Sequence, residues 1–304
     1  MEEKIRTEEH SLAPLLQNYG ASEDEYVSFL IERETGSSTL GFKNSDPLVF
    51  QNCFTHSRTD AINWILQTRA ALGFSFQTAY LSLAYFDRFL SKCSIDSDKS
   101  WAMRLLSVAC LTLAAKMEEH QVPALPEFQS EDYCFENKVI KRMELLVLST
   151  LEWNMAIITP LVFLPYFITK FCNESQTCHV FPKAMEIIFT LIQEVNLMDH
   201  RPSVIAAAAT LVAMDQHLTI EAVELKMSSI HQFTFLKAED IFAYYNQIQS
   251  FYNEKTIRHI HFPGPSPHLS WPVGMAGSSV VASAAMNKRR RPTFNNDKEG
   301  CDDE

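Results

Sequence analysis

The chain has 304 residues, of which 46% are hydrophobic and 21% charged, an ordinary composition for a globular protein of one large or two medium domains. Its formal net charge of −11 argues against a general nucleic-acid or membrane-surface binder, because such proteins present a basic footprint. Only 8 residues are glycine, against a usual share of about 7%, so folds rich in tight turns or glycine loops are disfavoured.

Helices are predicted throughout the first half of the chain. Apolar residues recur at helical spacing in four amphipathic segments: 23–33, 58–72, 77–90 and 136–151. A fifth segment, 99–118, differs because it is apolar or small on every side between Leu105 and Ala115. A helix without a polar face is surrounded by its neighbours, so this segment is predicted to lie at the centre of a helical layer.

The same order of elements recurs in the second half. Thr159-Pro160, Pro182 and Pro202 each predict the start of a helix, because proline is favoured at the first helical position. Residues 203–213 form a second stretch that is apolar on all sides, and a last amphipathic helix is predicted over 237–251. We therefore expect two similar helical layers, each wrapped around a central apolar helix.

Composition separates the ends of the chain from this helical body. Residues 262–287 contain no charged side chain and are dominated by Pro, Gly, Ser and Ala, so they cannot bury enough apolar surface to offset their chain entropy. We expect a disordered N-terminus at 1–22 and a disordered tail at 256–304. Between them we expect a first domain with a preceding helix at 23–155 and a second domain at 156–255.

The chain carries no motif of an enzyme or a metal site. GxGxxG, GxxxxGK[ST], HExxH and GxSxG do not occur, and the ten histidines never reach metal-ligand spacing. Seven scattered cysteines without a CxxC pair indicate a reducing compartment, and the longest apolar run, between Glu152 and Lys170, falls short of the ~20 residues that a membrane span needs. We expect a soluble intracellular protein that has no cofactor, metal or catalytic residue.

Four ordered stretches of the first half resemble the helix signatures of a cyclin box. Residues 60–66 (DAINWIL), 85–90 (YFDRFL) and 113–119 (LAAKMEE) resemble three successive helices, and 142–153 (RMELLVLSTLEW) resembles the closing helix, all at cyclin-like spacing. Trp153-Asn154 and the Thr159-Pro160 opening of a second box resemble plant D-type cyclins in particular. The resemblance implies an all-α fold of two tandem five-helix cyclin boxes, with an N-terminal helix and a disordered C-terminal tail.

Cyclins are not enzymes, and the resemblance implies a regulatory subunit that binds a cyclin-dependent kinase. In the family a lysine and a glutamate of the first box hold the backbone of the kinase αC helix, and the motifs place them at Lys116 and Glu144. A kinase needs its β3 lysine paired with the αC glutamate, so a partner that binds only that state favours activity. On periodicity alone, Lys116 would cap its own helix and Glu144 would be a surface acid.

Two further sets of residues match cyclin positions. Arg58 and Asp87 match a pair that cyclins bury between the first two helices, where an ion pair helps to specify the fold. Ala61, Trp64 and Gln67 match part of the groove by which cyclins capture Arg-x-Leu segments of substrates and inhibitors. Ala61 stands where mitotic cyclins carry a larger apolar residue, which implies a shallower groove, and Trp64 is alternatively an ordinary core aromatic.

The chain departs from many D-type cyclins in one motif. None of its seven cysteines has leucine two positions before it, so the Leu-x-Cys-x-Glu motif for retinoblastoma-type pocket proteins does not occur. The nearest match is Asp132-Tyr133-Cys134-Phe135-Glu136, which has aspartate at the leucine position. Binding of pocket proteins by that route is therefore doubtful.

The tail holds two candidate regulatory features. Ser266 precedes Pro267 and is a candidate phosphosite, where phosphate would add negative charge. A short basic block is a candidate nuclear-import signal, with a solvated charge run as the alternative: Lys288, Arg289, Arg290 and Arg291.

The sequence thus predicts a kinase regulator that promotes the G1/S transition of the cell cycle. The expected partner is the plant A-type cyclin-dependent kinase, with kinase inhibitors as further partners and with neither nucleic acid nor membrane. The expected location is the nucleus, with a cytoplasmic pool. A cyclin-box transcription factor or transcription-linked cyclin is the alternative, against which the net charge of −11 argues.

Overall fold

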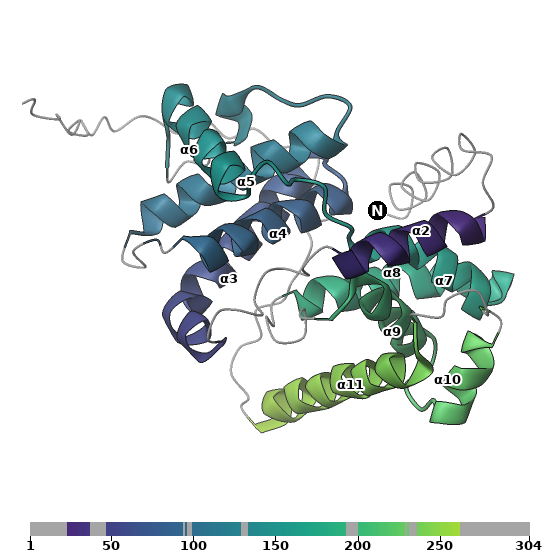
Figure 1. The fold of residues 1–304 in the computed structure, drawn as a ribbon. Helices are drawn as coiled ribbons and strands as arrows, with labels where there is room; N and C mark the ends of the chain where they lie inside the picture. The colour runs from purple at the N-terminus through teal and green to yellow at the C-terminus, as the bar shows by residue number, and fades with distance from the viewer. Residues whose placement is uncertain are drawn as a thin grey trace, which may run out of the picture. The chain divides into compact units, whose positions relative to one another are not determined.

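The computed structural model shows a chain built from helices (Figure 1). Across the residues that it describes, every extended regular element is helical, which confirms the all-α prediction. The described ranges are 23–36, 47–93, 95, 99–128, 133–192, 200–228, 230 and 236–261.

The first layer is centred on a helix that is buried along most of its length. Every residue of α5 (Ser100–Glu118) from Leu105 to Ala115 is buried, as its lack of a polar face predicts. Its neighbours in space are α3, α4 and α6 (Figure 1). The elements around α5 are α3 (Pro47–Leu72), α4 (Phe76–Lys92), the 3₁₀ helix η2 (Leu125–Phe128) and α6 (Asn137–Thr150).

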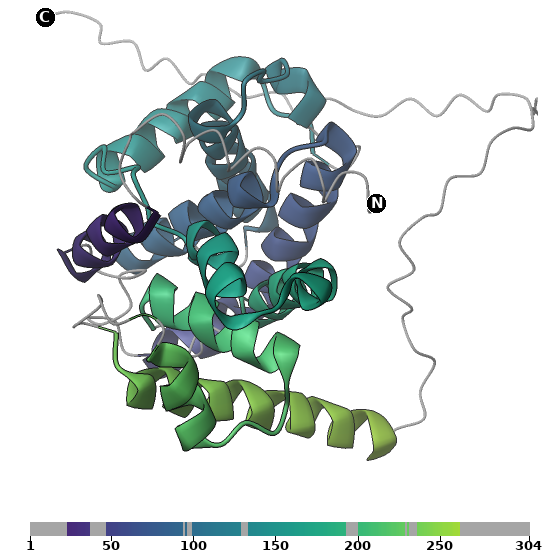
Figure 2. The ribbon, with the colours of Figure 1, turned by 90° about the vertical axis from the view of Figure 1, so that its right-hand side faces the viewer.

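The second layer repeats this plan around α9 (Pro202–Met214), which is buried from Pro202 to Ala213. Helices α7, α8 and α11 pack against α9, and Figure 2 shows the long α11 beside it. Pro160 opens a 3₁₀ turn that leads into α7, and Pro202 opens α9, as proline at a first helical position predicts. The other elements are η3 (Pro160–Phe163), α7 (Leu164–Phe171), α8 (Glu174–Leu191), α10 (Ile220–Met227) and α11 (Ala238–His261).

Two helix starts differ from the prediction. The predicted start at Pro182 is wrong, because α8 begins at Glu174 and Pro182 lies in its interior. The Asn173 N–H donates to Gln176 Oε1 over 3.4 Å, a capping-box contact that starts the helix well before the proline. Helix α3 also begins earlier than the predicted residue 58, at Pro47, another proline suited to a first turn.

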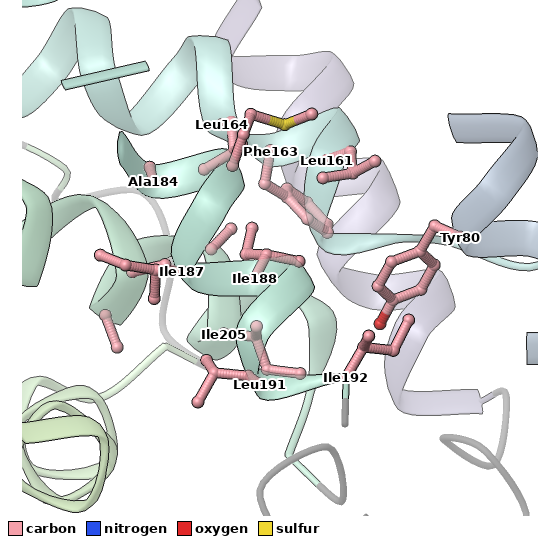
Figure 3. Packing of buried hydrophobic residues seen from close by; sticks show 14 of the residues in the cluster. Tyr80, Leu161, Phe163, Leu164, Ala184, Ile187, Ile188, Leu191, Ile192 and Ile205 are labelled. Carbon is pink, nitrogen blue, oxygen red and sulfur yellow. The ribbon is translucent and has the colours of Figure 1, made fainter. Parts of the chain in front are cut away.

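Buried side chains of the two layers meet at the end of α8. Leu161, Phe163 and Ile188 gather with Ile205 of α9 in one apolar cluster (Figure 3). Tyr80 of α4 belongs to the same cluster, and Figure 3 shows it directed toward Ile192. The two helical layers therefore share a continuous core.

Helix α2 (Glu23–Gly36) is bonded to the second layer, although it precedes the first in the chain (Figure 1). Asp24 accepts a hydrogen bond from the Tyr166 hydroxyl at 2.8 Å and lies 3.0 Å from Lys170 Nζ, both on α7. At the other end of α2, Glu34 accepts a hydrogen bond from the backbone N–H of Ser203 on α9. These contacts therefore tie α2, which precedes the first layer in the chain, to the second layer as well.

The disordered N-terminus and most of the disordered tail stay predictions, because residues 1–22 and 262–304 lie outside the described residues. Helix α11 continues to His261, past residue 255 where the tail is expected to begin. The candidate phosphosite and the basic block lie outside the described residues: Ser266, Lys288, Arg289, Arg290 and Arg291.

Candidate functional site

Lys116 and Glu144 lie side by side on neighbouring helices. Lys116 is in the last turn of α5, Glu144 is near the middle of α6, and Lys116 Nζ is 2.6 Å from Glu144 Oε1. The Lys116 side chain is 46% exposed, whereas that of Glu144 is 8% exposed. Glu144 is therefore a buried, paired carboxylate rather than a solvated surface acid.

The position of Glu144 follows from the amphipathic pattern of α6. Ile140 and Val147, one turn on either side of Glu144, are buried, so all three residues lie on the face that packs against the layer. A carboxylate on such a face is costly unless it is hydrogen-bonded. Its partners come from α5, because the Thr112 hydroxyl donates to Glu144 Oε1 at 2.6 Å beside the Lys116 contact. Thr112 had no role in the sequence-based prediction.

Several large apolar side chains of α5, α6 and the turn after α6 are exposed. Met117 follows Lys116, Leu145 follows Glu144, and Leu146 lies on the same helix, and all three are exposed. Trp153, just beyond α6, is 66% exposed. Exposed apolar groups that gather on neighbouring elements are typical of a binding surface, and we interpret these side chains in that way. We call Lys116, Met117, Glu144, Leu145 and Trp153 the α5–α6 surface.

Backbone conformation holds Trp153 outside the core. After α6, Glu152 and Trp153 both have left-handed backbone conformations, with φ of 55° and 58°. The Trp153 N–H closes this turn on the Leu148 carbonyl at 2.8 Å, and Glu152 forms an ion pair with Lys92 at 2.7 Å. Two consecutive non-glycine residues with positive φ are unfavourable, which is a feature often found at functional positions.

Arg58 and Asp87 form a buried ion pair between α3 and α4. Arg58 donates through Nε to Asp87 Oδ1 at 2.8 Å and through Nη2 to Asp87 Oδ2 at 2.7 Å. Arg58 Nη2 also donates to the Ile192 carbonyl at 2.8 Å, at the end of α8. The guanidinium thus satisfies a carboxylate of the first layer and a helix terminus of the second.

Comparisons with known proteins agree with this architecture. Residues 27–156 match the family model for the cyclin N-terminal domain, and residues 158–262 match the model for the cyclin C-terminal domain. The Cyclin-D5-1 of Arabidopsis thaliana is 34% identical over 283 residues, which cover 90% of this chain and 82% of the relative. This chain belongs to the plant D-type cyclins.

Two other similar proteins extend the comparison. The Cyclin-D5-1 of Oryza sativa subsp. japonica is 44% identical over 202 residues, 65% of this cyclin, but the match spans only 55% of that relative. A viral cyclin from herpesvirus saimiri, solved by X-ray crystallography, superposes with a TM-score of 0.55 at 15% identity. That match covers 73% of this chain and 97% of the viral one, and it supports the two-box cyclin fold.

The residues expected to form a substrate groove lie partly in the core of the cyclin. Ala61 and Trp64 are buried, and only Gln67 is exposed. The Trp64 ring is covered by the guanidinium of Arg104, with 4.9 Å between Cζ and the ring centroid. This placement favours the core alternative for Trp64, and the groove stays a prediction.

In the described part of the cyclin, no three His, Cys, Asp or Glu side chains gather as a metal site would require. None of its described helices is both long enough and apolar enough to cross a membrane.

Proposed function

We propose that this cyclin is the regulatory subunit of a cyclin-dependent kinase, which it binds and activates at the G1/S transition. The observation that carries the proposal is the Lys116–Glu144 pair, held at 2.6 Å at the edge of an exposed apolar surface. The partner is the plant A-type kinase. The cyclin itself contributes binding and no catalytic group.

The pair offers a donor and an acceptor next to each other. An ammonium group has three hydrogens, so Lys116 Nζ keeps two for a partner after it donates to Glu144. Within the described part of the chain both hydrogen bonds to Glu144 end on Oε1, which leaves Oε2 as an acceptor. A lysine donor and a carboxylate acceptor at this spacing fit the carbonyl and N–H groups of a partner backbone.

The exposed apolar side chains of the α5–α6 surface supply the apolar area that a stable interface needs. Met117, Leu145 and Trp153 are exposed on α5, on α6 and just beyond α6, and burying them would provide most of the favourable free energy of association. Excluding water also strengthens the hydrogen bonds of Lys116 and Glu144, because charges interact more strongly at a low effective dielectric. The α5–α6 surface therefore combines an apolar area with a polar pair that fixes orientation.

Binding to the αC helix accounts for activation. A kinase is active when its αC glutamate pairs with the β3 lysine and the ATP phosphates are aligned. A partner that binds only this αC position shifts the population toward it by its difference in affinity for the two states. The cyclin would act by this selection, without contact with the reacting phosphate.

A charge swap tests the proposal without destroying the ion pair. In the double variant Lys116→Glu, Glu144→Lys, the two charges still attract each other, but the donor and acceptor offered to a kinase are exchanged. We expect co-purification with the kinase and kinase activation to be lost, while helical content measured by circular dichroism is retained. The matched control exchanges an ion pair of the second box, Arg201→Asp with Asp240→Arg, and should retain binding. Undiminished kinase binding in the first variant would contradict the mechanism.

Pocket-protein binding through residues 132–136 has little support. The Tyr133 hydroxyl lies 2.9 Å from Ser100 Oγ, and the rings of Tyr133 and Phe135 stack with centroids 6.1 Å apart. Segments of this type bind by adding an extended strand to the partner, which requires them to leave their own fold. We therefore propose that pocket proteins are not captured by this route, and that kinase inhibitors reach the cyclin with its kinase.

A nuclear location, with a cytoplasmic pool, is part of the proposal. It is based on the basic block Lys288–Arg291, a pattern read by import receptors. Replacing these four residues with alanine in a fluorescent fusion should move the protein to the cytoplasm. An unchanged nuclear signal would show that the block is only a solvated charge run.

A further inference from the structure

We propose that Thr112 is a positioning residue for kinase binding, which fixes the carboxylate of Glu144 so that Oε2 faces the partner. This inference rests on the proposed function and adds a third, buried residue to the hydrogen-bonded group formed by Lys116 and Glu144. Thr112 is fully buried in α5, one turn before Lys116, and therefore acts through Glu144 rather than by touching the kinase.

The hydroxyl of Thr112 has two acceptors within reach and one hydrogen to donate. It lies 2.6 Å from Glu144 Oε1 and 2.9 Å from the Ala109 carbonyl of its own helix. A hydrogen bond to an ionised acceptor is shorter and about twice as strong as one between neutral groups. The hydrogen is therefore directed mainly to the carboxylate, across the interface between α5 and α6.

Two other buried hydroxyls, in the interior of α5 and of α9, form a different hydrogen bond. Ser107 donates to the Met103 carbonyl and Thr210 to the Ala206 carbonyl, each at 2.8 Å and four residues back along the same helix. Such back-bonding is the ordinary arrangement of serine and threonine inside a helix. Thr112 departs from it, because a charged group of a neighbouring helix competes for its hydrogen.

The two donors on Oε1 differ in rigidity. Lys116 approaches from the solvent side on a long side chain that is 46% exposed, and its contact alone would let the carboxylate turn and exchange its oxygens. Thr112 is β-branched and buried, so its hydroxyl is held in one position. Together they hold Oε1 inward, and the group that meets the kinase is already oriented before binding, which lowers the cost of association.

Affinity for the kinase tests this role in the full chain. Thr112→Val keeps the shape and removes the hydroxyl, and we expect the Kd for purified plant A-type kinase to rise about tenfold, corresponding to loss of one charge-assisted hydrogen bond. Thr112→Ser restores the donor and should bring the Kd back to within about threefold of wild type. The matched control, Thr210→Val, also removes a buried hydroxyl but should leave the Kd unchanged. Equal affinities for wild type and Thr112→Val would overturn the proposal.

A second measurement needs no kinase. In the free chain, a double-mutant cycle between Thr112→Val and Glu144→Ala should show coupling of about tenfold in the unfolding equilibrium constant. Additive effects would mean that the hydroxyl does not act on the carboxylate, and would also overturn the proposal. If wild type bound no kinase, the positioning role would fall together with the proposed function. Coupling together with wild-type binding but no effect of Thr112→Val would contradict the positioning role alone.

Discussion

Glu34 of α2 caps the buried helix α9 at Ser203, which lies 169 residues further along the chain. The Ser203 N–H donates to Glu34 Oε2 at 2.9 Å, and the Ser203 hydroxyl donates to Glu34 Oε1. Helix α9 has no side-chain cap of its own, because Arg201 at the N-cap position makes no such bond. A carboxylate at this end satisfies an orphan N–H and complements the helix dipole.

Removing this cap should destabilise the second box. Glu34→Ala leaves the buried Ser203 N–H and hydroxyl without their acceptor, and we expect the free energy of unfolding to fall by about 2–3 kcal/mol. Urea denaturation followed by circular dichroism measures the change. Glu186 is exposed on α8, so Glu186→Ala should change stability by less than about 0.5 kcal/mol. Equal effects of the two substitutions would show that α2 contributes nothing to α9.

The pH dependence of the free energy of unfolding should reveal the titration of the Glu34 carboxylate. Burial is the largest influence on Glu34 and raises its pKa above the ordinary value of 4.5, although hydrogen bonds from Ser203 and the charge of Arg201 oppose the shift. Between the unfolded and folded pKa values the folded state binds more protons, so the stability contributed by Glu34 falls as pH rises through this window. Glu34→Gln has no such titration. The stability of wild type relative to Glu34→Gln should therefore fall as pH rises from about 4.5, and a constant difference would contradict this.

The other end of α2 should respond to pH in the opposite direction. Hydrogen bonds from Lys170 and Tyr166 lower the pKa of Asp24 below its ordinary value of 3.8. Its contribution is present above the unfolded pKa and is lost as pH falls through the lower folded pKa. Unfolding of Asp24→Asn should therefore differ from wild type at neutral pH and converge with it in strong acid. A difference that did not change with pH would rule out titration of Asp24 as the cause.

The Arg58–Asp87 ion pair should behave as a coupled unit. Arg58→Leu leaves the Asp87 carboxylate buried without its cation and frees the Ile192 carbonyl, at an expected cost of about 3–5 kcal/mol. Asp87→Leu leaves the guanidinium uncompensated at a similar cost. The double variant leaves no lone charge, so we expect it to lose much less than the sum of the two, as measured by denaturant unfolding. Strict additivity would show that the pair is not a direct interaction.

The sequence predicted what depends on local patterns. The apolar helices α5 and α9 were recognisable because burial on all sides leaves a continuous signature in the residues themselves. The start of α8 was misplaced because Pro182 carries a strong helix-start preference, whereas the actual signal was the weaker Asn173–Gln176 pair. Neither case needed information from distant parts of the chain.

Contacts between residues that are far apart in the sequence could not be predicted from local patterns. Nothing near Glu34 in the sequence indicates that its hydrogen-bond partner is Ser203 on α9. Lys116 and Glu144 were predicted only from the motifs that contain them. Periodicity alone predicts that Lys116 caps its own helix and that Glu144 is a surface acid. Thr112 could have been noticed as a hydroxyl one turn before Lys116 in an apolar helix, but its acceptor on α6 is visible only in the structure.

Replacing Trp153 should have opposite effects on the stability of the fold and on the affinity for the kinase. It has φ of 58° and is 66% exposed, so its side chain contributes little to the core while its backbone is unfavourable for any residue except glycine. Trp153→Gly is expected to leave the free energy of unfolding unchanged or raise it by up to about 1 kcal/mol. The same change removes an aromatic anchor of the α5–α6 surface, so affinity for the kinase should fall at least about tenfold.

Leu225 on α10 is 74% exposed, and Leu225→Ala is the control that should bind normally. Calorimetric titration with the kinase decides the matter, since tight binding by Trp153→Gly would place Trp153 outside the interface.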